Sequence, residues 1–147
     1  STKLCLELCQ RDHILFDITP NITWWMFLED PLESYLKSLK KVYELDVDRT
    51  FPGHREFRGS HRKRIEELVV HHENRLQEVL EAVRRGYRTA WEVAPHVTWD
   101  LKYDRWEDVP LQQKFFAVGE TIAHLIHLER MGEVKRIEGD LVEFLPV

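Results

Sequence analysis

The chain of 147 residues carries 21 basic and 26 acidic side chains, which gives a net charge of −5 at neutral pH. This mild acidity argues against a large phosphate-binding surface, and two cysteines are too few for a disulfide framework. The longest apolar run, residues 24–28, is far shorter than the ~20 residues that span a membrane, and residues 1–10 lack the pattern of a secretory signal. We therefore expect a cytoplasmic protein without a membrane partner.

The first predicted elements are a hairpin, a helix and a short strand. Apolar residues alternate with others over residues 4–9, and residues 13–18 suit a second strand after a short connection. Asp30 followed by Pro31 is typical of a helix start, with Asp30 as the N-cap and Pro31 in the first helical position. Residues 47–51 then suit a short strand that leads into a sharp loop.

Three helices are predicted in the second part of the chain. Ser60 caps a helix over residues 61–85, Thr89 caps a shorter helix through Ala94, and a third helix covers residues 110–131. Each of these helices is followed by a residue that commonly ends helices: Gly86, Pro95 and Gly132.

A β-hairpin is predicted at the C-terminal end. Residues 133–137 and 141–144 alternate in hydropathy around a turn that contains glycine. The order of helix, helix, longer helix and hairpin is typical of a winged-helix domain. We therefore predict an α+β protein with one domain over residues 1–58 and a mostly helical, winged-helix-like domain over residues 59–147.

The first part does not form a complete fold by itself. One hairpin, one helix and one further strand would leave sheet edges unpaired, and the apolar residues 24–28 need a surface to pack against. This indicates that residues 1–58 belong to a larger structure.

Two segments of the first part carry a recognisable pattern. Residues 11–22 have the sequence RDHILFDITPNI, and residues 51–56 have the sequence FPGHRE. They resemble the GDHxLxxITPNI and LPGHxx segments of metallo-β-lactamase-fold hydrolases, with a helix of the type seen at residues 30–39 between them. Residues 71–76 and 123–132 resemble the winged-helix tail of the glyoxalase-II-like branch of these hydrolases.

The resemblance implies two metal ligands in this chain. Asp12 corresponds to the carboxylate that bridges two zinc ions, and His54 corresponds to the last zinc-binding histidine. The resemblance also implies a substrate rim formed by Thr19, Pro20 and Asn21. Arg11 stands where the family has a glycine, so the backbone before Asp12 departs from the family pattern.

Other ligands of the two-zinc site are missing from the sequence. The family carries an HxHxDH motif near the start of its αββα fold, and this motif is absent here. The chain therefore resembles only the C-terminal part of such a hydrolase. Because a catalytic zinc ion normally has three protein ligands, we expect zinc binding by this chain alone to be weak or absent.

Three polar residues of the third helix share one stripe, namely Glu120, His124 and His127. Such a stripe can serve as a metal or proton-relay site. We interpret it instead as the solvent-facing side of an amphipathic helix. The opposite, apolar side then comprises Phe115, Phe116, Ile122, Ile126 and Met131.

Two small basic clusters are further candidate binding features. Residues 61–64 form one cluster, and Arg84, Arg85 and Arg88 form another. They could contact phosphates, but we favour a solvated surface, because residues 59–147 carry more acidic than basic side chains.

We predict that the chain is the C-terminal portion of a metal-dependent hydrolase. The substrate of this hydrolase would be a thioester, lactam or phosphodiester. This portion supplies two metal ligands and a wall of the substrate cleft, and the chain alone is expected to be inactive. Its partners would be the remainder of the hydrolase domain or a second copy, together with a small-molecule substrate. The alternatives are a winged-helix DNA-binding regulator, which the acidic charge disfavours, and a non-catalytic dimerisation module.

Overall fold

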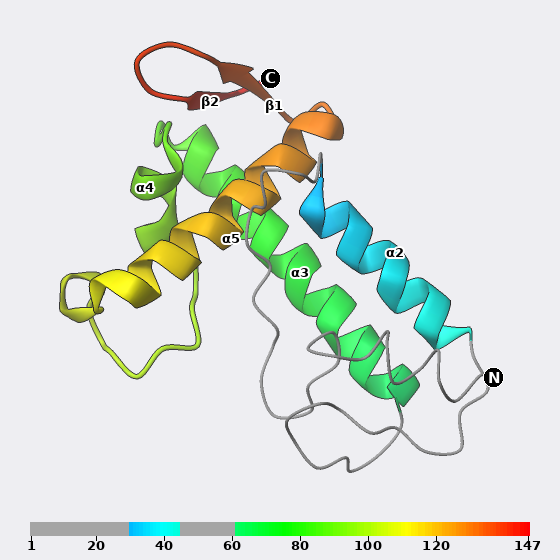
Figure 1. The fold of residues 1–147 in the computed structure, drawn as a ribbon. Helices are drawn as coiled ribbons and strands as arrows, with labels where there is room; N and C mark the ends of the chain where they lie inside the picture. Colours follow the sequence, from blue (N-terminus) through cyan, green and yellow to red (C-terminus); the bar gives the residue numbers. More distant parts are fainter. Residues whose placement is uncertain (1–29, 45–60) are drawn as a thin grey trace. The chain divides into compact units, whose positions relative to one another are not determined.

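The computed structural model describes residues 30–44 and 61–147 (Figure 1). The chain divides into two compact units, and the division passes through α2 and α3. One unit contains the described residues 33–44 and 61–72, and the other contains residues 30–32 and 73–147. The described part is mostly helical and has one two-stranded antiparallel sheet. The hairpin and strand predicted within residues 1–58 lie outside the described residues, and the domain division at residue 58 stays a prediction.

Helix α2 spans Pro31–Tyr43 and begins as predicted, directly after Asp30. Proline suits the first turn because its missing N–H would have no partner there. Apolar residues recur along α2 at helical spacing, and they are buried: Leu32, Tyr35, Leu39 and Val42. One side of the helix is therefore an apolar packing surface.

Helix α3 spans His61–Arg84 and ends within one residue of the predicted position. Gly86 has a φ of 107°, a left-handed conformation that favours glycine. The Gly86 and Tyr87 amides donate hydrogen bonds to the carbonyl oxygens of Val83 and Ala82, at 3.0 and 3.3 Å. These bonds satisfy carbonyl groups that the helix end would otherwise leave without partners.

Helix α4 is a single turn, Ala90–Val93, and the predicted Thr89 cap is confirmed. The Thr89 hydroxyl accepts a hydrogen bond from the Glu92 amide at 3.2 Å. A 3₁₀ turn, η1 (Ala94–His96), follows α4 directly and contains Pro95. A second 3₁₀ turn, η2 (Trp106–Asp108), precedes the next helix.

Helix α5 lies where the sequence predicted it, and the terminal hairpin forms with its second strand two residues later than the predicted residues 141–144. Helix α5 spans Leu111–Arg130, and Gly132 follows it with a φ of 79°. Strand β1 (Val134–Ile137) pairs with β2 (Glu143–Pro146), with Val134 opposite Pro146.

The core of the second unit brings α3, α4, α5 and the hairpin together. Its buried residues are Val79, Leu80, Ala82, Val83, Ala90, Val93, Val97, Leu125, Leu128, Val134 and Phe144. The Phe144 amide also donates to the Arg88 carbonyl oxygen at 2.7 Å, which ties β2 to the start of α4. Among the described residues, no helix is long and apolar enough to cross a membrane.

Candidate functional site

The predicted metal ligands and rim residues lie outside the described residues. These are Asp12 and His54 for the metal, and Thr19, Pro20 and Asn21 for the rim. Their roles therefore stay predictions. Half of the buried polar residues that the structure describes lie along one side of α5.

The polar stripe of α5 is buried, so its predicted solvent-facing position is wrong. We define the inner face of α5 as Glu120, Thr121, His124 and His127, none of which is more than 8% exposed. Conversely, Phe115, Phe116 and Met131, which were predicted to form the packing side, are 45–74% exposed. Burial of ionisable side chains requires partners, and α5 finds them on other elements.

Glu120 of the inner face forms a buried ion pair with Arg75 of α3. Nη1 of Arg75 donates to Oε2 of Glu120, and both side chains are almost fully buried. Nη2 of Arg75 donates to the Thr98 carbonyl oxygen at 3.1 Å, and the guanidinium lies 4.5 Å from the centre of the Trp99 ring. The arginine thus joins α3, α5 and the loop after η1 through one charged group.

The loop that receives Arg75 is itself held by hydrogen bonds. Glu78 accepts from the Thr98 hydroxyl at 2.6 Å and from the Thr98 amide at 3.2 Å. The Trp99 indole N–H donates to the Ala94 carbonyl oxygen at 2.8 Å. These bonds keep the Trp99 ring in place over the guanidinium, where a cation–π contact adds to the ion pair.

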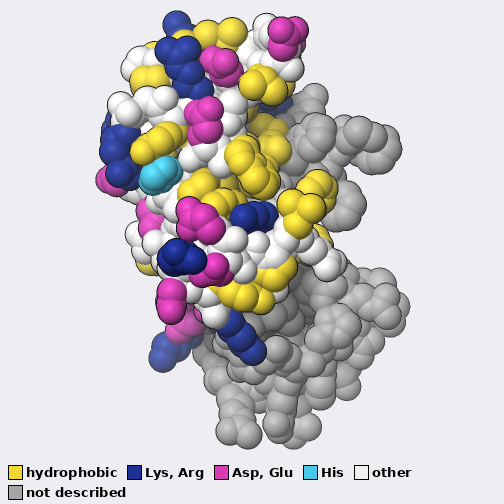
Figure 2. Space-filling model, turned by 90° about the vertical axis from the view of Figure 1, so that its left-hand side faces the viewer, with side chains coloured by type: hydrophobic (Ala, Val, Ile, Leu, Met, Phe, Trp, Pro, Cys, Tyr) yellow, Lys and Arg dark blue, Asp and Glu magenta, His cyan; other side chains and the backbone are white. Residues whose placement is uncertain are grey.

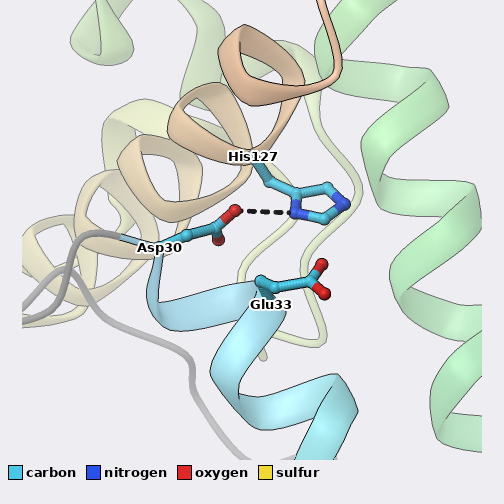
Figure 3. Close-up of side chains that lie close together, drawn as sticks. All are labelled: Asp30, Glu33 and His127. Atoms are coloured by element: carbon cyan, nitrogen blue, oxygen red, sulfur yellow. Dashed lines mark hydrogen bonds and ion pairs between the residues drawn. The ribbon is translucent and has the colours of Figure 1, made fainter.

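A second buried pair joins α5 to the start of α2. Nδ1 of His127 and Oδ2 of Asp30 lie 3.0 Å apart, although the two residues are 97 positions apart in sequence. Figure 3 shows the Asp30 carboxylate turned toward the His127 ring; Glu33, also drawn, comes one turn further along α2. This hydrogen bond fixes the residue that immediately precedes α2 against α5.

The remaining polar groups of the inner face bond within α5. His124 Nδ1 lies 2.7 Å from the Glu120 carbonyl oxygen, and the Thr121 hydroxyl donates to the Ala117 carbonyl oxygen at 2.8 Å. Glu120 and His124 belong to no metal-binding group within the described part of the chain. The hydrogen-bond partners found for the inner face are Arg75, Asp30 and backbone carbonyl groups of α5.

A smaller polar cluster lies at the C-terminal end of α2, in the unit that contains residues 33–44 and 61–72. The Tyr43 hydroxyl donates to Oε1 of Glu66 at 2.9 Å, and Nε of Arg62 donates to the Tyr43 carbonyl oxygen at 3.0 Å. This hydrogen bond to the Glu66 carboxylate, with its negative charge, raises the pKa of Tyr43 above its usual value.

Several arginines of the two basic clusters form ion pairs. Arg64 lies 3.3 Å from Glu67, Arg84 lies 3.6 Å from Glu133, and Arg88 lies 3.4 Å from Glu143. The face shown in Figure 2 likewise mixes Lys and Arg with Asp and Glu around hydrophobic side chains. This distribution does not favour phosphate binding.

The DNA-binding alternative needs base-reading side chains on the exposed side of α5. Glu120 and His124 of α5 are almost fully buried and do not belong to that side. Buried side chains on an inward face cannot reach base edges in a groove.

Sequence reasoning missed Arg75 as a partner for Glu120, although a signal was present. Positions 65, 68, 72, 75 and 79 continue one helical line in α3, and Ile65, Leu68 and Val79 on it are buried. His72 and Arg75 occupy the same line, so their burial follows from the spacing. An arginine on an apolar line requires a buried acid nearby, and Glu120 supplies it.

Comparison with known proteins agrees with the motifs. Residues 76–145 match the family model described as metallo-beta-lactamase-like, C-terminal domain. The structure is similar to a beta-lactamase domain protein from Burkholderia ambifaria, with 31% identity and a TM-score of 0.78. It is also similar to a metallo-beta-lactamase family protein from Thermus thermophilus, with 30% identity and a TM-score of 0.74.

In both comparisons the match covers 92% of this chain and 40% of the solved chain. The resemblance to metallo-β-lactamase-fold proteins that the sequence motifs predicted is therefore confirmed. The chain spans about 40% of the length of the solved structures that it matches.

Proposed function

We propose that this chain supplies the C-terminal portion of a zinc-dependent hydrolase of the metallo-β-lactamase superfamily. The observation that carries the proposal is the family match over residues 76–145, a range that includes Glu120 of the buried ion pair. Metal use is implied by this superfamily. Zinc as the metal, and hydrolysis of a thioester, lactam or phosphodiester as the reaction, belong to the proposal.

Asp12 and His54 are the two ligands that this chain would contribute. A carboxylate offers two hard oxygen donors, and the histidine follows a Pro-Gly pair in the sequence. When bound, zinc activates water for attack on the substrate. Thr19, Pro20 and Asn21 would line the rim beside Asp12 and orient the substrate.

Residues 59–147 would form the wall of the substrate cleft as a winged-helix-like domain. The order α3, α4, α5 and hairpin supports this arrangement. The two buried pairs of the inner face of α5 would keep the wall rigid, because they tie α5 to α3 and to the start of α2. A rigid cleft wall would hold the substrate in a fixed position relative to the reacting groups.

The remaining ligands would come from the rest of the hydrolase domain or from a second copy of the chain. Two ligands fall short of the three that catalytic zinc sites usually have, so the chain alone would bind zinc weakly and remain inactive. The substrate would be a small molecule, without nucleic acid or membrane as partner. The small number of cysteines supports a cytoplasmic location.

The test is the zinc content of the 147-residue chain, measured by mass spectrometry after purification without chelator. His54→Ala is the variant, and His96→Ala, which removes an exposed histidine of η1, is the matched control. We expect less than one zinc per chain, a loss in His54→Ala, no change in His96→Ala, and no hydrolysis of thioester, lactam or phosphodiester probes.

Two results would change this proposal. About two zinc ions per chain with zinc-dependent turnover would mean that a second copy completes the site. A wild-type chain that retains measurable zinc, with the same zinc content in His54→Ala, would contradict the ligand assignment and favour a non-catalytic module.

A further inference from the structure

The second unit contains a cavity that the proposed hydrolase chemistry does not use. Its volume is about 250 Å³, and five of its six lining residues are apolar. The lining comes from α4, α5 and the hairpin, and it consists of Ala90, Ile122, Ile126, Arg136, Val142 and Phe144.

The walls of this cavity are well supported. Ala90, Ile126 and Phe144 are each at most 9% exposed, and Ala90 and Phe144 belong to the core of the unit. The hydrogen bond from the Phe144 amide to the Arg88 carbonyl oxygen fixes the hairpin against the start of α4. The side of the cavity formed by these three residues is thus largely in place before a ligand arrives, which lowers the entropic cost of binding, whereas Val142 at the other side is 49% exposed.

Arg136 of β1 is the charged member of the lining. Its Nε donates to Oε2 of Glu129 at 2.8 Å, and its guanidinium carbon lies 5.9 Å from the centre of the Phe144 ring. Nη1 lies 3.8 Å from Glu138, a long contact to a side chain that is 77% exposed. Nη2 has no partner among the described residues. Nη2 of this lining residue is thus the nitrogen left to donate to an anion.

We propose that this cavity binds a small alkyl carboxylate, with the chain against the apolar wall and the carboxylate on Arg136. A methylene group occupies about the volume of a water molecule, ~30 Å³, so the cavity accommodates a chain of roughly eight carbons. A guanidinium and a carboxylate match in charge and in donor geometry. The inference goes beyond the proposed function, because none of the six residues is a proposed metal ligand.

Acetate, hexanoate, octanoate and octanol are the probes, titrated against the 147-residue chain below their micelle-forming concentrations and followed by amide NMR shifts. Each methylene added between acetate and octanoate should tighten binding about fourfold. Octanol should bind roughly 10- to 100-fold more weakly than octanoate, because it lacks the charge-assisted hydrogen bonds. The shifts should concentrate on the amides of Ala90, Ile122 and Val142.

Two variants with matched controls test the two ends of the ligand. Arg136→Gln should remove the preference for octanoate over octanol, whereas Arg88→Gln should retain it, because Arg88 pairs with a hairpin glutamate but does not line the cavity. Val142→Trp should fill the cavity and weaken octanoate at least tenfold. The same substitution at the neighbouring exposed Leu141 should have little effect.

Three results would overturn the proposal. The first is the absence of saturable octanoate binding to the folded chain. The second is an equal loss in Arg136→Gln and Arg88→Gln, which would indicate a general surface charge effect. The third is a dimer in sedimentation that Val142→Trp dissociates and octanoate leaves unchanged, because then a second copy covers the cavity. Thermal melts of each variant show whether the fold is retained.

Discussion

The two sides of α5 use the same residue types with different consequences. On the inner face, Glu120 pairs with Arg75 where both side chains are at most 6% exposed. On the outer side and the hairpin, Arg136 pairs with Glu129 where both side chains are 33% exposed. Removal of one partner of a buried pair leaves an uncompensated charge away from water, whereas water solvates the remaining partner of an exposed pair. The inner pairs are therefore expected to contribute more to the packing of the domain than the outer pairs.

The largest effect is expected at the buried ion pair. Glu120→Gln leaves the Arg75 guanidinium buried without a carboxylate and should lower the free energy of unfolding by about 3–5 kcal/mol. The control is Glu143→Gln, which removes the partner of Arg88 at the surface and should cost less than about 1 kcal/mol. Urea denaturation of the two variants measures the difference, and equal losses would remove the distinction between the two sides.

The same pair offers a sharper form of the test. A double variant, Arg75→Met with Glu120→Leu, removes both charges and replaces them with apolar groups of similar size. Because no buried charge then lacks a partner, its stability should exceed that of Glu120→Gln. A double variant less stable than the single variant would mean that the ion pair stabilises the fold beyond cancelling the cost of its two buried charges.

A middle-sized effect is expected where α5 holds the start of α2. His127→Ala leaves the buried Asp30 carboxylate without its histidine partner and should cost about 1–3 kcal/mol in urea denaturation. His96→Ala removes an exposed histidine whose ring stacks on Tyr87 but which has no buried charged partner, and it should cost clearly less. If the two variants lose the same stability, the Asp30–His127 hydrogen bond does not support the inner face.

The smallest effect is expected at the exposed end of α2. The Glu66 carboxylate raises the folded-state pKa of Tyr43, so its stabilisation is present below about pH 10 and is lost as the pH rises through the raised pKa. Tyr43→Phe should therefore melt slightly below wild type at about pH 8, and the gap should close in more alkaline buffer. Tyr103→Phe, at an exposed tyrosine, should show no such pH-dependent gap; an identical profile for both would contradict the role of Glu66.

The ends of the helices could be predicted from sequence because local residues determine them. Pro31, Thr89, Gly86 and Gly132 act through their own backbone or through hydrogen bonds to residues a few positions away. The terminal hairpin followed in the same way from alternation around a glycine-containing turn. Such signals need no knowledge of the tertiary fold.

The orientation of α5 could not be predicted in the same way. Glu120 and His127 are polar, and their burial depends on Arg75 and Asp30, which are far away in sequence. Hydropathy alone therefore placed Phe115, Phe116 and Met131 in the core although they are exposed, whereas Ile126 of the same predicted side is buried. For the candidate site, the resemblance of Asp12 and His54 to zinc ligands remains a prediction, because these residues lie outside the described part of the chain.

The central claim is that Asp12 and His54 bind the same zinc site, and a calorimetric zinc titration of single and double alanine variants tests it most directly. Each single variant should weaken zinc binding at least roughly tenfold, the double variant should be little worse than either, and Asp17→Ala, a nearby aspartate, should match the wild type. Independent, additive losses, or zinc binding that none of these substitutions changes, would contradict the account.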